Sequence, residues 1–374
     1  MVPWCQKPAA LEESYAESVR AVYATGFGGE DPLLNLEVGE QPDPAVSPGW
    51  ALVRVSAASL NHHDLWTLRG VSSWPLTPPR ILGCDAAGRV ESLGQATDGA
   101  PAVGTRVVVH SVIGCGTCAA CRAGSPGLCQ RMALLSDPPH GGALAELVAV
   151  PAANLVPLPE TVGDAAAACL PTAYLTAYHM LFERAGLRPG MSALVQGASG
   201  GVATAAVLLA GIAGVEVHVT SRDPAKRRAA EMLGATSSFD PGDRDAAREL
   251  IRRTDGGVDA VLETVGEATW ELSLRAVRPG GTVVVAGATS GPNPKAQLNR
   301  VFWRQITIMG STMGTRVELE RLVVLCAAAK LRPLIDRTFP LEQAASAFAV
   351  LAAGAQQGKI VVVVTAGSAG AAPS

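Results

Sequence analysis

The chain has 374 residues, of which 48% are hydrophobic and 17% are charged, and its 30 basic residues nearly balance its 33 acidic ones. This composition predicts a globular protein of two or three domains and gives no sign of a nucleic-acid or membrane partner. No apolar run approaches the ~18 residues of a membrane span, and the first residues carry acids where a signal peptide needs an apolar stretch, so we expect a cytoplasmic protein with reduced thiols.

The first part of the chain has the pattern of a β domain. Residues 19–158 contain short β runs broken by Gly and Pro, among them 50–59, 86–94 and 105–112. Such runs predict an antiparallel, β-rich domain with few helices.

One loop of this β-rich part, at about 114–130, holds four of the eight cysteines: Cys115, Cys118, Cys121 and Cys129. In a reducing compartment this clustering favours a metal over disulfides. The spacing allows all four thiolates to surround one tetrahedral Zn²⁺ and leaves no position for a water molecule. The loop therefore predicts one structural zinc per chain. A zinc ribbon that binds nucleic acid would need a basic surround, and only Arg122 and Arg131 are near.

The pattern changes after residue 181, where strands begin to alternate with helices of 10–15 residues. The predicted strands are 192–197, 215–221, 258–266, 281–288 and 305–312, and helices are expected at 201–214 and 224–235. This alternation predicts a doubly wound parallel sheet, and the apolar strands fit burial on both faces. A helix at 317–330 and a strand at 358–364 follow.

A glycine-rich turn joins the first of these strands to the first helix. Gly197, Gly200 and Gly201 form it, Ala203 follows, and small residues there let the backbone approach a pyrophosphate at the helix N-terminus. Val202 is predicted as a further cofactor contact. A tight βα turn without a ligand would look similar. Because four further strands of the same kind follow, we predict a dinucleotide-binding site.

The next strand ends where the cofactor ribose is expected, and it offers Ser221, Arg222 and Lys226. These residues favour a 2′-phosphate and hence NADPH. Asp223 is the alternative ribose-binding acid, but in Asp-Pro-Ala-Lys it also reads as a helix N-cap followed by Pro at the first helical position. We favour the cap.

With these motifs in place, the chain from about 21 to 364 resembles the medium-chain dehydrogenase/reductase superfamily. The segments 61–66, 83–88, 302–314 and 358–362 resemble its quinone-oxidoreductase-like, zinc-binding dehydrogenase branch. The resemblance implies a GroES-like catalytic domain from 1–173 and 313–374 and a Rossmann domain from 174–312. It also implies cofactor contacts at Thr176, Gly287, Ala288 and Lys359, and a homodimer formed through the exposed last Rossmann strand.

Zinc alcohol dehydrogenases of this superfamily carry a second, catalytic zinc. The resemblance places its three ligand positions at Asn61, Cys84 and Thr172, and two of these residues are poor zinc ligands. An improvised site from Cys169, His62, His63 and Asp85 is the alternative. The pattern Asn-x-x-Asp followed by Gly-x-acid-Ala-Ala-Gly instead resembles the zinc-free quinone and enone reductases.

Without a catalytic metal, hydride addition to a conjugated carbonyl is the easier reaction. It needs a donor for the enolate oxygen and a proton for the α-carbon. We predict Asn61 as the donor, His63 and Tyr174 as proton donors, and Asp64 as an orienting group. Other roles are open: Asn61 could cap a turn, Tyr174 could fill the core, and adjacent His62 and His63 would point to opposite faces of a strand.

The predicted function is therefore NADPH-dependent reduction of a small-molecule quinone or α,β-unsaturated carbonyl compound. Two alternatives remain open at this point. One is a zinc-dependent alcohol dehydrogenase with an atypical ligand set, and the other is a cofactor-binding protein of this fold without turnover.

Overall fold

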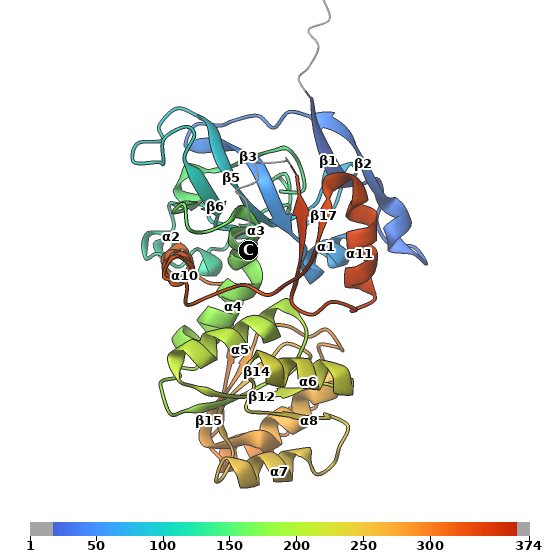
Figure 1. The fold of residues 1–374 in the computed structure, drawn as a ribbon, viewed down its shortest axis with the longest axis vertical. Helices are drawn as coiled ribbons and strands as arrows, with labels where there is room; N and C mark the ends of the chain where they lie inside the picture. Colours follow the sequence, from blue (N-terminus) through green and yellow to red (C-terminus); the bar gives the residue numbers. More distant parts are fainter. Residues whose placement is uncertain (1–17, 365–374) are drawn as a thin grey trace, which may run out of the picture.

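The computed structural model describes residues 18–364, so Cys5 and the two terminal stretches lie outside the described residues. Two parts lie end to end along the long axis of the molecule, a β-rich part and an α/β part (Figure 1). No helix of the described residues is both long enough and apolar enough to cross a membrane.

The β-rich part is built on a seven-stranded sheet of order β10-β6-β5-β3-β18-β17, with β9 also paired to β3. All of its pairings are antiparallel except that of β17 with β18. A three-stranded sheet (β2-β1-β4) and a two-stranded sheet (β7-β8) complete it. The strands are β1 (Ser18–Ala24), β2 (Leu36–Pro42), β3 (Trp50–Ser59), β4 (Arg80–Ile81), β5 (Asp85–Leu93), β6 (Arg106–Val109), β7 (Val112–Ile113), β8 (Ala133–Leu134), β9 (Leu147–Pro151), β10 (Leu155–Pro157), β17 (Ile335–Pro340) and β18 (Lys359–Val363).

Short helices cover this part, and they come from both ends of the described chain. They are η1 (Pro32–Asn35), α1 (His62–Leu68), α2 (Ala119–Arg122), η2 (Pro126–Leu128), η3 (Ala152–Asn154), α3 (Asp164–Ala168), η6 (Leu341–Gln343) and α11 (Ala344–Ala352). Figure 1 shows α11 and β17, drawn in red, beside the blue strands of the first residues. The predicted β-rich domain is thus completed by residues from far along the chain.

The α/β part is a six-stranded parallel sheet of order β13-β12-β11-β14-β15-β16. This is the order of a dinucleotide-binding Rossmann sheet, and it confirms the predicted fold class. The strands are β11 (Ser192–Val195), β12 (Glu216–Thr220), β13 (Ser237–Phe239), β14 (Val258–Glu263), β15 (Val277–Val285) and β16 (Thr307–Gly310). The helices are α5 (Gly201–Ala213), α6 (Pro224–Leu233), α7 (Ala246–Arg253), α8 (Glu267–Ala276) and α9 (Leu298–Trp303).

A helical junction connects the two parts. It runs through η4 (Leu170–Tyr174), α4 (Leu175–Tyr178) and η5 (His179–Arg184), and α10 (Arg316–Ala327) packs against it as the chain returns. One hydrophobic cluster includes Ala57 and Val108 of the seven-stranded sheet together with Val195 and Val284 of the six-stranded sheet. This shared core fixes the walls of the space between the sheets. The domain boundaries at 173 and 313 stay a prediction.

Candidate active site

A cavity of about 370 Å³ lies between the two sheets. Its walls come from α1, the junction, the glycine turn, the connection from β16 to α10, and the start of β18. The side chains and backbone that line it include Asn61, His62, His63, Trp66, Leu134, Thr172, Thr176, Gly197, Gly200, Gly201, Val202, Gly287, Ser311, Met313, Gln356 and Lys359. Most residues that the sequence singled out for cofactor and substrate therefore meet in one place. Ser221, Arg222, Lys226, Asp64, Tyr174 and Ala288 are not among the lining residues.

The glycine turn has the geometry of an anion site. Gly197 has a φ of +107°, which side chains rarely adopt, and Gly200 is the N-cap of α5 with no side chain bonded to the helix end. A Cβ at Gly200 would meet no atom within 4 Å. The first N–H groups of a helix lack partners within the helix, so this open turn fits the pyrophosphate of a dinucleotide.

Gly201 is needed for a different reason. A Cβ there would lie 2.8 Å from Cδ of Lys359 and 3.0 Å from Cβ of Ala173. The side chain of Lys359 thus crosses the turn on its way into the β-rich part. The glycine turn and β18 of the other sheet are therefore in direct contact.

A buried polar chain supports the turn from behind, and the sequence analysis did not find it. Thr220 Oγ1 accepts from the N–H of Gly197 (3.1 Å) and donates to Oε1 of Gln196 (2.7 Å). Nε2 of Gln196 donates to Ser273 (2.9 Å), whose hydroxyl donates to Glu263 (2.6 Å). Because each member is bonded to the next, the turn is held rigidly. In the sequence, this polar chain is indicated only by polar residues at the ends of strands that are otherwise apolar.

The residues proposed to select NADPH follow β12. Asp223 is the N-cap of α6, and its Oδ1 accepts from the N–H of Ala225 (2.7 Å), so the cap interpretation is confirmed. Arg222 is exposed and makes no hydrogen bond or ion pair with residues 18–364. Lys226 instead donates from Nζ to the carbonyl of Gly354 (2.6 Å). Arg222 is thus the cation that remains available to a 2′-phosphate.

The other cofactor predictions are placed as follows. Thr176 lines the cavity, with its hydroxyl 3.8 Å from Sδ of Met313. Gly287 also lines it, and a Cβ there would lie 2.9 Å from the carbonyl of Thr264. The structure adds two side chains that the sequence missed. Ser311 Oγ and Gln356 Oε1 are buried at the cavity without a hydrogen-bond partner among residues 18–364, so both are free to bind a ligand.

Asp85 is the centre of a buried cluster that includes the three mapped zinc-ligand positions. Its carboxylate accepts from Ser59 Oγ (2.7 Å), Asn61 Nδ2 (2.8 Å) and Thr172 Oγ1 (2.6 Å). The thiol of Cys84 lies 3.4 Å from Nδ2 of Asn61 and 3.5 Å from Oγ1 of Thr172. Burial and the neighbouring Asp85 raise the pKa of the Cys84 thiol well above its usual value.

Lys359 brings a buried positive charge into this cluster. Its Nζ donates to Oδ1 of Asn61 (2.6 Å) and to the carbonyl of Leu60 (2.7 Å), and it lies 3.5 Å from Oδ2 of Asp85. The side chain of Lys359 is 3% exposed. Lys359 lines the cavity, but its ammonium is directed to the β-rich part rather than to the glycine turn.

The prediction that Asn61 donates to an enolate oxygen is corrected by these contacts. Its Nδ2 already donates to Asp85 and, at 3.2 Å, to the carbonyl of Ser59, while its Oδ1 accepts from Lys359. Asn61 is also the N-cap of α1. An amide with both N–H groups committed has none left for substrate. Asn61 therefore organises the cluster.

Asp64 orients the backbone, as the sequence predicted, and it lies under α1 without lining the cavity. Its two oxygens accept from the N–H groups of Asn61 (2.8 Å) and Gly83 (3.0 Å). Complete burial raises the pKa of this carboxyl. Its role is to fix the start of α1 against β5.

His62 and His63 are the first two residues of α1, so the expectation of a strand with opposite faces was wrong. On a helix, neighbouring residues are about 100° apart, and both rings reach the cavity. Burial, followed by the charges of Lys359 and Arg69, lowers the pKa of His62. Burial also acts to lower the pKa of His63, but Asp137, Asp64 and Asp85 outweigh it and raise that pKa. His63 is thus the ring that retains a proton at higher pH.

Tyr174 does not reach the cavity, so its predicted role as a proton donor is corrected. The side chain is fully buried in the junction, and its hydroxyl accepts from the N–H of Leu334 (2.7 Å). Burial raises the pKa of this phenol further. The alternative interpretation of Tyr174 as a core residue applies.

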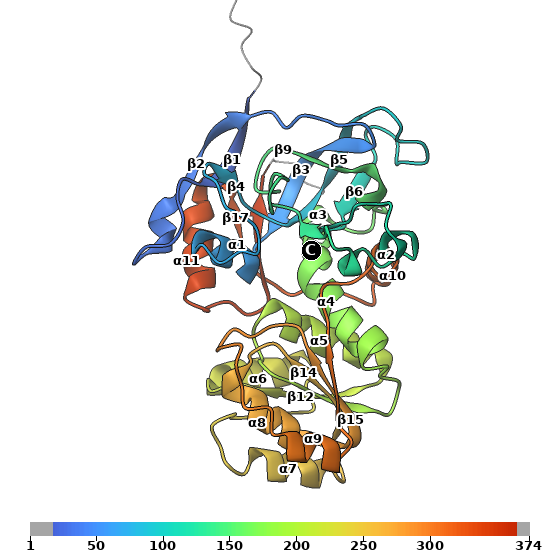
Figure 2. The same cartoon turned by 180° about the vertical axis from the view of Figure 1, so that it is seen from behind.

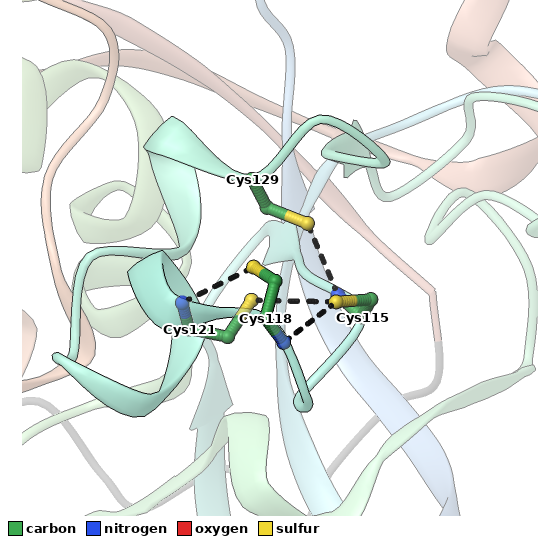
Figure 3. A group of neighbouring side chains, drawn as sticks. All are labelled: Cys115, Cys118, Cys121 and Cys129. Carbon is green, nitrogen blue, oxygen red and sulfur yellow. Dashed lines mark hydrogen bonds between the residues drawn. The ribbon is translucent and has the colours of Figure 1, made fainter.

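The four clustered cysteines form a compact group beside α10, which we call the cysteine lobe (residues 114–130; Figures 2 and 3). Their sulfur atoms all lie within 4.8 Å of one another, and those of Cys115 and Cys121 are 3.9 Å apart. Tetrahedral zinc with Zn–S bonds of about 2.3 Å requires S–S separations of about 3.8 Å.

Backbone N–H groups favour the thiolates of Cys115 and Cys129 and lower their pKa values, whereas desolvation raises the pKa of Cys121 to about 11. The N–H of Cys118 points to Cys115 Sγ (3.3 Å), and that of Arg131 points to Cys129 Sγ (3.3 Å). Such contacts, first among them that of the Thr117 backbone, lower the pKa of Cys115 to about 5. The donor set and its spacing fit zinc, and all four positions come from the protein.

Among residues 18–364 this is the one place where three or more potential ligand atoms of His, Cys, Asp or Glu converge. The improvised second site is not assembled. Cys169 donates its thiol to the carbonyl of Ala165 (3.3 Å), and Asp85 is bonded within its own cluster.

Two family models match the chain. The zinc-binding dehydrogenase model covers residues 201–328, and the alcohol dehydrogenase GroES-like domain model covers residues 47–160. A crystal structure of an NAD-dependent alcohol dehydrogenase is similar at a TM-score of 0.86 and 36% identity, and the match covers 92% of this chain and 100% of that one.

Curated relatives differ in size and in reaction. The chain is 31% identical over 320 residues to a phenolphthiocerol/phthiocerol polyketide synthase protein of Mycobacterium tuberculosis, and the match covers 83% of the chain but 13% of that protein. It is 29% identical over 332 residues to an acryloyl-coenzyme A reductase of Metallosphaera sedula, with 87% of the chain and 96% of the reductase covered.

Proposed function

Because the chain belongs to the medium-chain dehydrogenase/reductase superfamily of oxidoreductases, we propose that it reduces a quinone or an α,β-unsaturated carbonyl compound with NADPH and without a catalytic zinc. The similarity to an acryloyl-coenzyme A reductase supports reduction of a conjugated double bond. The similarity to an alcohol dehydrogenase structure supports the rival reaction.

The observation that carries the proposal is the buried ammonium of Lys359 at the mapped zinc position. Asn61 and Thr172 direct their polar atoms to Asp85, and Lys359 already supplies the positive charge that balances this carboxylate. An amide and a hydroxyl are poor ligands for zinc, and a dication beside a fixed ammonium would be repelled. The cluster therefore favours chemistry that needs no Lewis acid.

The residues of the chain would divide the work as follows. NADPH, held at the glycine turn, would supply the hydride for the β-carbon of the acceptor, and negative charge would then develop on the carbonyl oxygen. His63, whose pKa is raised, offers positive charge to this enolate and a proton to the α-carbon. Trp66 and His62, whose rings lie 6.3 Å apart, form an aromatic wall of the cavity. Arg222 would bind the 2′-phosphate.

The test is stopped-flow oxidation of NADPH by a panel of enones, enals and quinones, with simple alcohols and NADP⁺ in the reverse direction. We expect turnover of at least one conjugated acceptor, little alcohol oxidation, and initial rates that a short treatment with chelator does not change. Chelator-sensitive alcohol oxidation without enone turnover would establish the alcohol dehydrogenase instead. Tight NADPH binding without turnover of any acceptor would identify a cofactor-binding protein.

A homodimer is part of the proposal. β16 pairs with β15 on one side only, and its residues Thr307 and Ile308 are exposed. Beside it, α9 exposes Phe302 and Trp303, the latter at 83%. An edge strand with apolar neighbours is suited to pairing with a second copy. Sedimentation velocity on the full chain decides between a dimer and a monomer.

A further inference from the structure

The proton donor of the proposed reaction has a partner that lies 74 residues further along the chain. Nε2 of His63 is buried and lies 3.3 Å from Oδ1 of Asp137, at the distance of an ion pair but without the geometry of a hydrogen bond. Nδ1 of His63 makes no hydrogen bond with any residue between 18 and 364, and the ring lines the cavity. The imidazole therefore has a carboxylate at ion-pair distance from one nitrogen, and its other nitrogen has no partner among residues 18–364.

Asp137 is fixed by its own short loop. Its Oδ2 accepts from the N–H of Leu134 (2.8 Å), and its backbone N–H donates to the carbonyl of the same residue (2.9 Å). The N–H of His140 donates to the carbonyl of Asp137 (2.7 Å), and this hydrogen bond closes the loop. Ser136 sits at a φ of +79°, a conformation that a non-glycine residue keeps only where the surroundings impose it. Four constraints thus aim one carboxylate oxygen at His63.

The loop that carries Asp137 begins at a strand that is fixed by hydrogen bonds. It follows β8, which pairs with β7 at the base of the cysteine lobe, and the N–H of Leu135 donates to the carbonyl of Ser111 (2.8 Å). Leu134, which is bonded twice to Asp137, itself lines the cavity. The carboxylate is therefore positioned by the same segment that forms part of the cavity wall.

We propose that Asp137 is a positioning residue, which holds the Nε2–H of His63 so that Nδ1 faces the substrate and delivers the proton. This inference rests on the proposed function. In the step, the N–H bond at Nδ1 breaks and a C–H bond forms at the α-carbon of the enolate. The ring becomes neutral and keeps its proton at Nε2, next to Asp137, and solvent returns a proton to Nδ1.

The charges around the ring agree with this assignment. Asp137 and two further carboxylates favour the protonated ring, and the cation of Arg80 acts on Asp137 from β4. His63 lies in the first turn of α1, where the helix dipole disfavours a positive charge. The negative charge of Asp64 in the same turn offsets this effect. Four titratable or charged groups act on His63 or Asp137: Asp64, Asp85, Arg80 and His140. Lys359 acts on the neighbouring ring of His62.

The test compares wild type with Asp137→Asn, which keeps an oxygen for the N–H of Leu134 but removes the charge. The matched control is Asp98→Asn, at an exposed carboxylate. Nitrogen-15 NMR of labelled histidine, with His63→Gln to assign the signal, reports both the pKa and the tautomer of His63. We expect wild type to show a neutral ring protonated at Nε2. In Asp137→Asn we expect a lower pKa and a mixture of tautomers, and in the control no change.

Enzyme kinetics form the second arm. The protonated ring is the acid, so activity declines as pH rises through its pKa, and in Asp137→Asn this decline moves to lower pH. We expect kcat at pH 8 to fall at least about tenfold, part of the roughly 10²–10⁴-fold that a positioned acid contributes, with an unchanged KM for NADPH. Asp137→Ser replaces Asp137→Asn if the latter does not fold.

If His63 in Asp137→Asn keeps its wild-type pKa and tautomer, Asp137 does not position it. A loss of kcat in this variant with the wild-type pH profile would also overturn the positioning role. If wild type reduces no conjugated acceptor at any pH, the proposed function fails, and the NMR arm still decides whether Asp137 positions His63.

Discussion

Replacement of Lys359 by Met tests how the candidate site is held together. The change removes the ammonium but keeps an unbranched stem that passes Gly201. Leu60 and Asn61 lose a charged donor at 2.7 Å and 2.6 Å, and Asp85 is left buried without a neutralising charge. All other contacts of Asp85 remain.

The magnitude follows from burial. A hydrogen bond to a charged group contributes about 1.5–3 kcal/mol, and removal of one member of a buried ion pair typically costs about 3–5 kcal/mol. We expect the larger range here because Asp85 is fully buried and the Lys359 side chain is 3% exposed. With an unfolding entropy of about 2.1 cal/mol/K per residue, the loss corresponds to a decrease in Tm of about 4–6 °C for this chain.

The assay is differential scanning fluorimetry, with calorimetry on the same samples. Lys330→Met is the matched control, since that lysine is exposed three residues after α10 ends and its loss should shift Tm by less than about 1 °C. A double change of Lys359→Met with Asp85→Asn should cost less than the sum of the single changes, because no unpaired charge remains. A Tm of Lys359→Met within about 1 °C of wild type would refute the claim that this ammonium holds Asn61 and Asp85 in place.

Two further predictions concern the metal and the cofactor. Cys129→Ser should lower the zinc content and the soluble yield under reducing conditions without a selective loss of turnover, and elemental analysis of a stable, reduced wild type that contains no zinc would contradict the cysteine lobe as a metal site. Arg222→Ala should weaken NADPH binding by about 1–3 kcal/mol in calorimetric titrations and leave NADH binding nearly unchanged. If wild type binds NADPH and NADH equally well, Arg222 does not recognise the 2′-phosphate, and a residue other than Arg222 binds the ribose.

The fold could be predicted to the extent that its signals are local. The glycine turn, the Asp223 cap and the four cysteines each lie within one short segment, and the apolar strands stand out one by one. β13 was missed because it has three residues, Ser237–Phe239, and two of them are serines. Its position at the sheet edge depends on pairing with β12 rather than on its own pattern.

The site could be predicted only in part because its decisive contacts are not local. Lys359 and Asn61 are 298 residues apart, and nothing in either segment shows that the amide oxygen and the ammonium meet. The pairing of His63 with Asp137 is hidden for the same reason. Family patterns indicated which residues gather near the cavity, but they did not show that both N–H groups of Asn61 are committed or that Tyr174 faces the core.

The position of β18 in the middle of the seven-stranded sheet governs when the site can form during synthesis. Residues Ala57–Ser59 of β3 pair on one side with β5 and on the other with Val361–Val363 of β18. At roughly 5–20 residues per second, a ribosome needs about 15–60 s to reach β18 after β3 has been made. Throughout that interval the backbone edge next to Asn61 is open and Asp85 lacks its cation. The nascent β-rich part therefore carries an unpaired strand edge, and the candidate site is completed only after the whole six-stranded sheet has been translated.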